Sequence, residues 1–209
     1  MKRFLLFALT AGLFSPLSAF AEKANRVIMI SSGSMIPTLQ KEDRIIVNEN
    51  AYLNRSPQRG DIISFASPFS FDAKLISNRK TPLPSKAECK KAGGPAAKDR
   101  ACQMYIQRIV AIGGDQVFVT SKGELYLNGK LVIEPYYPSI NCPESNPYMC
   151  LEVSGKVPNG SVLVLGDNRG NSWDSRFWPS GPFLPIEKIL GRAETIVLPL
   201  ERAGSLRGD

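Results

Sequence analysis

The hydrophobic positions of this chain fall into short runs separated by turn residues. Gly, Pro, Asn and Asp stand between the runs, and no stretch repeats its apolar positions at a sustained helical spacing. Short apolar runs bounded by turn residues are typical of antiparallel strands rather than of βαβ units. The pattern therefore predicts a mainly β protein. Its expected strands cover residues 27–30, 44–47, 62–65, 104–112, 161–165 and 191–198.

Two of these predictions bear directly on the later argument. The apolar run at residues 27–30 is expected to be a buried strand that leads into a serine-rich loop. Residues 124–133 are expected to form a β-hairpin, because their central Asn128-Gly129 pair suits a type I′ turn.

Three segments lack a strand pattern. Residues 66–103 shift to Pro, Lys, Ser and Gly and are predicted to be a surface insertion. Residues 134–160 form a connection rich in Pro and Cys, and residues 201–209 are expected to be a loose tail. The β domain should thus span residues 22–200, interrupted by the segments 66–103 and 134–160.

The N-terminus has the layout of an export signal. Lys2 and Arg3 precede an uncharged apolar run over residues 4–21, which ends Ala19-Phe20-Ala21. The run is also long enough for a short membrane anchor. Both interpretations stay open. Each puts the remaining chain on the extracytoplasmic side of the cytoplasmic membrane, anchored by residues 4–21 or released to the periplasm by cleavage after Ala21.

Export agrees with the presence of four cysteines, because an oxidising compartment favours disulfides. Proximity favours the pairs Cys89–Cys102 and Cys142–Cys150, although four cysteines allow three connectivities. A metal site is not expected, since the chain has no C-x-x-C spacing and no histidine.

The charge of the chain says less about its partners. The net charge is +7, and the basic residues are scattered, without a dense run interleaved with aromatic residues. Nucleic-acid binding is therefore not expected, whereas attraction to an anionic membrane surface is. No cofactor is implied, and the chain is expected to be a monomer.

The candidate chemistry centres on the serine-rich loop at residues 31–39. Ser34 follows Gly33, and Pro37 should hold Ile36 extended and so stiffen the approach to Ser34. Ser34 is the candidate nucleophile, and the Ser32 hydroxyl could point at a developing oxyanion. Because the chain lacks histidine, a Ser-His-Asp triad is excluded. The remaining common base is a lysine whose pKa is lowered by burial.

A second loop concentrates polar groups directly after the strand at 161–165. It runs from Gly166 to Arg176 and carries more hydrogen-bonding side chains than a turn needs. The alternative interpretation is a surface loop in which Asp174 pairs with Arg176 or Arg169, which would contribute little stability.

Three motifs together resemble the type I signal peptidase family, membrane-bound serine endopeptidases that remove export signals. Their order along the chain also matches. The motifs are Ser32-Gly33-Ser34-Met35-Ile36-Pro37-Thr38-Leu39, then Tyr105-Ile106-Gln107-Arg108-Ile109-Val110 through Gly114-Asp115, and Gly166-Asp167-Asn168-Arg169 through Ser172, Asp174, Ser175 and Arg176.

The resemblance implies an antiparallel β-sheet catalytic core with a smaller β subdomain, here with disulfide-bearing insertions. It implies that Ser34 is the nucleophile, that Ser32 joins the Ser34 N–H in an oxyanion hole, and that Ser172 orients the base. The residues it implies as supports of the site are Asp167, Arg169, Asp174, Arg176 and Arg108.

One position departs from the family, because Gln107 stands where the family has its lysine base. A carboxamide is neutral and cannot accept the serine proton. Four interpretations stay open: a non-catalytic homologue, a lysine recruited from elsewhere, an unusual base, or an engineered inactivation. A recruited lysine is disfavoured because none of the candidates lies in an apolar strand. The candidates by residue type are Lys41, Lys74, Lys80, Lys122 and Lys188.

The expected function has two forms. The first is an endopeptidase that cleaves signal peptides from exported preproteins after small residues in an Ala-x-Ala pattern. The second is a binding module that adds the same extended segment as a strand without cutting it.

Overall fold

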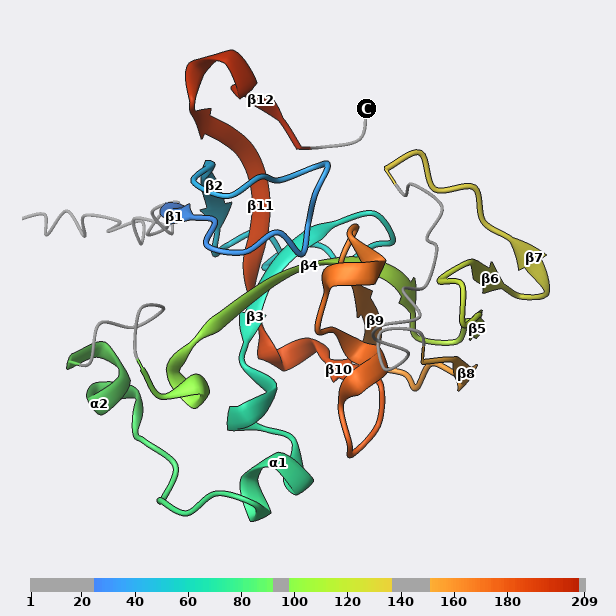
Figure 1. Cartoon of the computed structure of the whole chain (residues 1–209), viewed down its shortest axis with the longest axis horizontal. Helices are drawn as coiled ribbons and strands as arrows, with labels where there is room; N and C mark the ends of the chain where they lie inside the picture. Colours follow the sequence, from blue (N-terminus) through green and yellow to red (C-terminus); the bar gives the residue numbers. More distant parts are fainter. Residues whose placement is uncertain (1–24, 92–97, 137–150, 207–209) are drawn as a thin grey trace, which may run out of the picture.

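The strands of this protein form two antiparallel sheets (Figure 1). The computed structural model describes residues 25–91, 98–136 and 151–206. The large sheet has the order β1-β2-β11-β3-β4-β9-β10, with β12 paired to β11, and the small sheet has the order β7-β6-β5-β8. The mainly β prediction is confirmed. The large sheet contains β1 (Asn25–Met29), β2 (Arg44–Asn48), β3 (Ile62–Ala66), β4 (Met104–Ile112), β9 (Ser161–Leu165), β10 (Phe183–Pro185), β11 (Ile189–Leu198) and β12 (Gly204–Ser205), and the small sheet β5 (Gln116–Val119), β6 (Leu125–Leu127), β7 (Lys130–Leu131) and β8 (Val153–Lys156).

The predicted hairpin is confirmed as β6 and β7. Asn128 and Gly129 have φ values of 52° and 80°, so both central residues of the turn have the positive φ that a type I′ turn requires.

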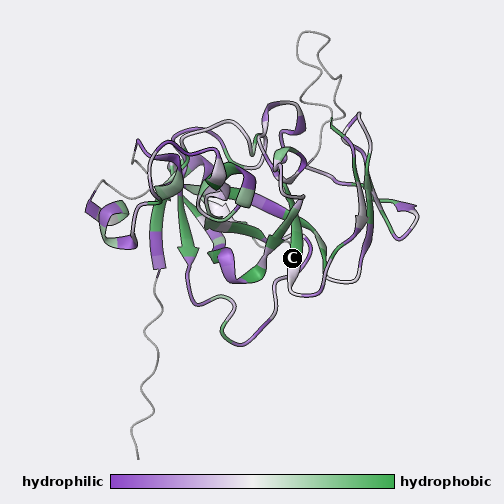
Figure 2. Cartoon of the chain, turned by 90° about the horizontal axis from the view of Figure 1, so that it is seen from below, coloured by the Kyte–Doolittle hydropathy of each residue, from purple (hydrophilic) through white to green (hydrophobic). Residues whose placement is uncertain are grey.

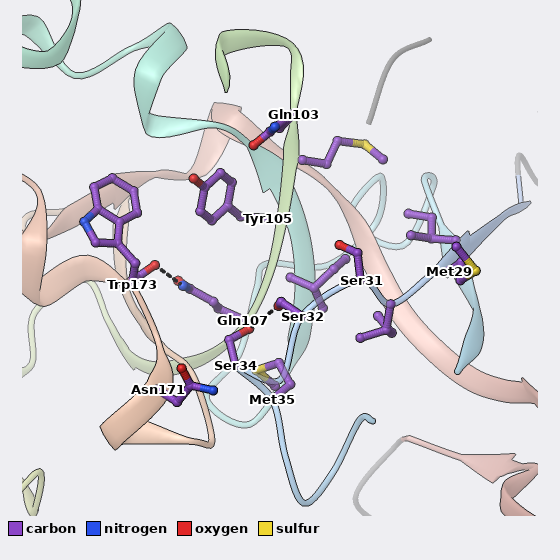
Figure 3. A pocket seen from close by; sticks show the side chains of 14 residues that line it. Met29, Ser31, Ser32, Ser34, Met35, Gln103, Tyr105, Gln107, Asn171 and Trp173 are labelled. Carbon is purple, nitrogen blue, oxygen red and sulfur yellow. Dashed lines mark hydrogen bonds between the residues drawn. The ribbon is translucent and has the colours of Figure 1, made fainter. Parts of the chain in front are cut away.

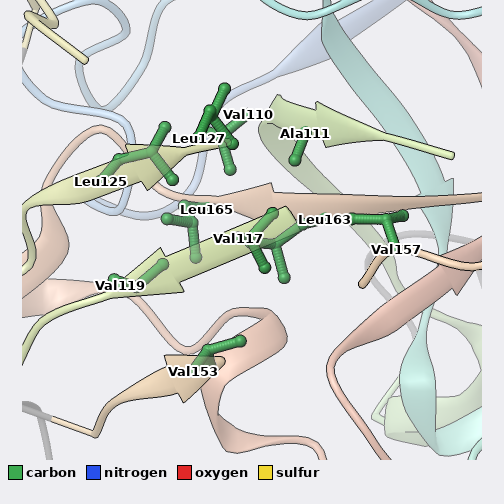
Figure 4. Packing of buried hydrophobic residues seen from close by; sticks show 10 residues of the cluster. All are labelled: Val110, Ala111, Val117, Val119, Leu125, Leu127, Val153, Val157, Leu163 and Leu165. Carbon is green, nitrogen blue, oxygen red and sulfur yellow. The ribbon is translucent and has the colours of Figure 1, made fainter. Parts of the chain in front are cut away.

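Apolar side chains from both sheets form one core, which fixes the small sheet on the end of the large one (Figure 4). The large sheet supplies residues from β4 and β9, and the small sheet supplies residues from β5, β6 and β8. Burial of each such side chain contributes about 1.5–3 kcal/mol. In the hydropathy colouring of Figure 2, many strand segments are apolar and many connections are polar. The buried members are Val110, Ala111, Val117, Val119, Leu125, Leu127, Val153, Val157, Leu163 and Leu165.

Two further cores lie on opposite faces of the large sheet. Ile62 and Ile63 are neighbours in β3 yet belong to different cores, as expected when successive side chains point to opposite faces. The core that contains Ile62 also contains Met35 and Leu39, which are 1% and 0% exposed. The serine-rich loop is therefore anchored in the protein interior on both sides of Pro37.

The insertion between β3 and β4 is a folded unit. It contains α1 (Ala73–Ser77), α2 (Lys86–Lys91) and a short 3₁₀ turn over Arg100–Cys102. The predicted disulfide Cys89–Cys102 is present and ties α2 to that turn. The second predicted pair, Cys142–Cys150, lies outside the described residues, as does the candidate signal or anchor at residues 1–21.

The predictions for the burial of the first strand and for the C-terminal tail are wrong. Strand β1 is largely exposed rather than buried, with Val27 and Met29 61% and 59% exposed, because β1 is the end strand of the sheet and pairs with β2 alone among the described strands. The predicted tail instead continues the fold up to residue 206: β12 pairs with β11, and Arg202 donates two hydrogen bonds to Asp43. No helix within residues 25–91, 98–136 and 151–206 is long and apolar enough to span a membrane.

The Cys89–Cys102 disulfide closes a loop with a sequence separation of 13 residues. Closing a loop of this length stabilises a folded unit by about 3 kcal/mol. We expect the double variant Cys89→Ser/Cys102→Ser to accelerate amide hydrogen exchange in the Arg100–Cys102 turn, while exchange in β5 stays unchanged. Unchanged exchange in the turn would show that the disulfide does not stabilise the insertion.

Candidate active site

A cleft of about 440 Å³ opens between the end of β1 and the first half of β4 (Figure 3). Its walls are apolar and neutral polar side chains, and none of the lining residues carries a charge. They are Ile28, Met29, Ile30, Ser31, Ser32, Ser34, Met35, Gln103, Met104, Tyr105, Ile106, Gln107, Asn171 and Trp173.

The cleft lies between two strand edges. Residues 104–107 of β4 pair with β3 on one side, whereas the pairing of β4 with β9 on its other side begins only at Arg108. On the opposite wall, β1 pairs with β2 and with no other described strand. Both walls therefore offer unpaired backbone groups to an extended peptide.

Ser34 lines the cleft and is half-buried. Its hydroxyl lies 3.1 Å from the Ser32 hydroxyl, at hydrogen-bonding distance. Residues 34–38 form consecutive turns, so the extended approach expected at Ile36 is not observed. The loop is instead held by the Ile36 N–H, which donates to the Gly33 carbonyl, and by the Leu39 N–H, which donates to the Met35 carbonyl.

Asn168 fixes the Ser34 loop to the loop at residues 166–176. Its backbone N–H donates to the Ser34 carbonyl at 3.0 Å, and its side-chain Nδ2 donates to the Gly33 carbonyl at 2.9 Å. Sequence reasoning named the motif that contains Asn168 but gave this residue no role. No local signal distinguishes it from an ordinary turn asparagine.

Gln107 is buried in the cleft wall, 1% exposed. Its Nε2 donates to the Trp173 carbonyl at 2.9 Å, which fixes the orientation of the carboxamide. Among the described residues, Gln107 Oε1 has no hydrogen-bond partner, and the same is true of the buried Ser172 Oγ. Leaving a buried polar group unpaired costs about 1–3 kcal/mol. Strand β4 and the loop at 166–176 thus each carry one buried polar atom without a partner among the described residues, Gln107 Oε1 and Ser172 Oγ.

Gly166 allows Ser172 and Ser34 to lie side by side. A Cβ atom at position 166 would come within 2.5 Å of both Ser172 Cβ and the Ser34 carbonyl oxygen, and closer still to Ser172 Oγ. Only glycine fits between these two groups. The structure therefore brings Ser172 next to the backbone of Ser34.

Buried ion pairs hold the loop at 166–176 in shape. Asp174 accepts hydrogen bonds from Arg176 Nε and from the Gly166 N–H, and the side chains of both charged residues are at most 1% exposed. Arg169 pairs with Glu134 at 2.6 Å, with side chains 0% and 2% exposed. The alternative of a surface loop with solvent-exposed pairs is therefore wrong. Glu134 escaped sequence reasoning because nothing near it in the chain marks it.

Arg108 connects β4 to the same loop. It donates to both carboxylate oxygens of Asp167, at 2.9 and 2.7 Å, and Thr38 donates to Asp167 from the serine loop. Burial alone would lower the pKa of Arg108, but the hydrogen bonds and charge of Asp167 outweigh it and raise the pKa. Arg108 therefore stays charged. Asp167 in this way joins the serine loop to β4.

The five lysines considered as replacement bases lie away from this centre. None of them is among the residues that line the cleft, although all five are in the described part of the chain. Lys188 is half-buried and the others are exposed. The exposed ones are Lys41, Lys74, Lys80 and Lys122.

Comparison with known proteins assigns the family. The family model described as "Signal peptidase, peptidase S26" matches residues 1–198. The chain belongs to this signal peptidase family. A probable signal peptidase I-2 of Synechocystis is 36% identical over 86% of this chain, and a signal peptidase I of Leptolyngbya laminosa is 34% identical over 85%.

The chain spans 66% and 70% of the length of these two relatives. Among solved structures, a signal peptidase I of Enterococcus faecalis is similar with 24% identity and a TM-score of 0.39. That match covers 66% of this chain and 97% of the other.

Gly166→Ala should disturb both serine segments of this signal peptidase site. The added methyl group has no space, so we expect a loss of about 1–3 kcal/mol in the free energy of unfolding. Urea denaturation measures it. Gly204→Ala is the matched control, because an added Cβ there meets no atom within 4 Å. Equal effects of the two changes would contradict the close approach described for Gly166.

Glu134→Ala should destabilise the protein by about 3–5 kcal/mol, because it leaves the buried Arg169 charge without its carboxylate. Arg26→Ala removes one partner of the exposed Arg26–Glu49 pair, whose side chains are 50% and 31% exposed, and should cost about 0–1 kcal/mol. Urea unfolding of both variants tests the difference. A loss below 1 kcal/mol for Glu134→Ala would contradict the assigned role of the pair.

Proposed function

We propose that this chain binds the signal segments of exported preproteins in the cleft, as a serine endopeptidase of the signal peptidase type whose proton transfer is impaired at Gln107. The family membership and the names of the relatives support signal-peptide cleavage as its general activity. The two unpaired strand edges support an extended substrate, because they offer backbone partners along both sides of the cleft.

The substrate residues beside the cut are proposed to be small, in an Ala-x-Ala pattern. The apolar side chains that line the cleft favour this specificity, since shallow apolar pockets discriminate between side chains that differ by a few methylene groups. These walls are formed by Ile28, Ile30, Met35 and Ile106.

Each serine of the site has a proposed role. Ser34 attacks the carbonyl carbon of the scissile bond. The Ser32 hydroxyl and the Ser34 N–H donate to the developing oxyanion, and the 3.1 Å separation of the two hydroxyls supports this proximity. Ser172 orients the group at position 107. The buried ion pairs of Asp174, Arg176 and Arg169, together with the Arg108–Asp167 pair, support the site.

One observation carries the proposal about position 107. Gln107 Oε1 and Ser172 Oγ are both buried and lack partners among the described residues. A lysine at position 107 would not carry the unpaired Oε1, and its amine has N–H donors for an acceptor such as Ser172 Oγ and, when neutral, a basic lone pair. We therefore infer that Gln107 occupies the position of a lysine base.

The second candidate function is a binding module without cleavage, which Gln107 itself favours. A carboxamide cannot take the Ser34 proton, whereas the strand edges that would bind a peptide do not depend on position 107. The two functions share one cleft and one substrate class, and they differ in turnover alone.

The location follows from the same proposal. A protein that processes exported chains works where they emerge, on the extracytoplasmic side of the membrane. Residues 4–21 would anchor the chain there or, if removed after Ala21, release it to the periplasm. The net charge of +7 favours contact with an anionic membrane surface.

Gln107→Lys should create or raise preprotein cleavage by about 10² to 10⁴-fold, because it supplies a positioned general base. The measurement is cleavage of a model preprotein with an Ala-x-Ala site by the full chain in detergent.

Ser34→Ala in both backgrounds is the control. Cleavage by the unmodified chain that Ser34→Ala abolishes would exclude the pure binding module. Absence of cleavage by Gln107→Lys, when the variant is folded and binds the preprotein, would overturn the assignment of position 107.

A further inference from the structure

The insertion brings one uncompensated positive charge to the rim of the cleft. Arg100 is exposed, and its guanidinium carbon lies 3.7 Å from the ring centre of Phe69 and 5.4 Å from that of Trp173. Its NH2 group donates to the Tyr105 hydroxyl at 3.3 Å. Tyr105 and Trp173 both line the cleft.

These contacts hold the guanidinium without neutralising it. All of its partners are neutral, and no described carboxylate forms an ion pair with Arg100. On the other side of the cleft, Arg26 also approaches Met104, but it is paired with Glu49 at 2.7 Å. A guanidinium stacked on a ring keeps N–H donors free along its edge, in the fork geometry that binds a carboxylate.

The backbone of Arg100 is fixed from both sides. Asp99 caps its 3₁₀ turn by accepting from the Ala101 N–H and pairs with Arg79, whose hydrogen bonds lower the pKa of Asp99 to about 2. Two residues later, Cys102 joins the disulfide with Cys89. The aromatic stack is ordered as well, with Phe69 and Trp173 stacked at 5.4 Å. The charge is therefore held in place at the rim.

We propose that Arg100 is a specificity-determining residue that binds a carboxylate side chain of the peptide in the cleft. The inference rests on the proposed function, since it assumes that an extended peptide occupies the cleft. The residues that line the cleft are uncharged, so the charge of Arg100 at the rim would favour an acidic over a neutral residue at one position of that peptide.

The test measures binding of labelled peptides to the full chain by fluorescence anisotropy in detergent micelles. The peptides are built on residues 15–26 of this chain, which contain Ala19-Phe20-Ala21 followed by Glu22. A single glutamate is moved through positions 18 to 24, with glutamine at position 22 where it is moved away. Each peptide is compared with the one that has glutamine at the same position.

We expect glutamate to bind about threefold to fivefold more tightly than glutamine at one position, the range of an exposed ion pair. Arg100→Gln should abolish this ratio and leave the affinity for the glutamine peptide unchanged. Arg100→Lys should keep most of it. The matched control Lys98→Gln removes an exposed charge two residues away and should leave the ratio intact.

The outcomes separate the two proposals. If no peptide binds, the proposed function fails and this inference fails with it. If the peptides bind and Arg100→Gln leaves every glutamate-to-glutamine ratio unchanged, the inference alone is wrong. If Arg100→Gln weakens both members of each pair equally, Arg100 only supports Trp173, and the specificity role is overturned.

Discussion

The site depends on charges that are buried together. Asp174 pairs with Arg176, and Arg169 with Glu134, in side chains that are at most 2% exposed. Removing charges from water is expensive, so such pairs are tolerated only where each charge also has hydrogen-bond partners. The charges of this loop have such partners: Arg176 donates to the Arg169 carbonyl, and Asp174 accepts from the Gly166 N–H. The buried charges of the loop are consequently paired in the observed conformation, and that conformation presents Ser172 and Asn168 to the serine loop.

Hydrogen bonds connect this loop to the serine loop and to β4, the two other parts of the site. Asn168 holds the Ser34 and Gly33 carbonyls, while Asp167 accepts from Thr38 on one side and from Arg108 on the other. These hydrogen bonds thus connect the serine loop, β4 and the loop at 166–176. Gln107 is held to the loop at 166–176 through its Nε2, which donates to the Trp173 carbonyl, whereas its Oε1 has no partner among the described residues.

The sequence predicts the strands whose apolar runs are continuous, such as β2 and β9, and the hairpin whose turn needs positive φ. It misses β5, β8 and β10, which are only three or four residues long. The exposure of β1 depends on its place at the end of the sheet, which an apolar run does not reveal. The sequence motifs contain Ser34, Ser172 and the charged residues of the loop at 166–176. They do not reveal Glu134, which reaches Arg169 across 35 positions of the chain.

Recognition and chemistry place different demands on position 107. The proposed extended peptide would be bound through backbone groups of the strand edges, and these do not change when one side chain is replaced. A lysine base, in contrast, must be held neutral in a buried setting, which costs the free energy of desolvating an amine. Glutamine avoids that cost because it is neutral at every pH, and it keeps a donor for Trp173. Under the proposed function, the strand edges that would bind a peptide are therefore present in a chain with Gln107, and peptide binding and proton transfer make separate demands on the cleft.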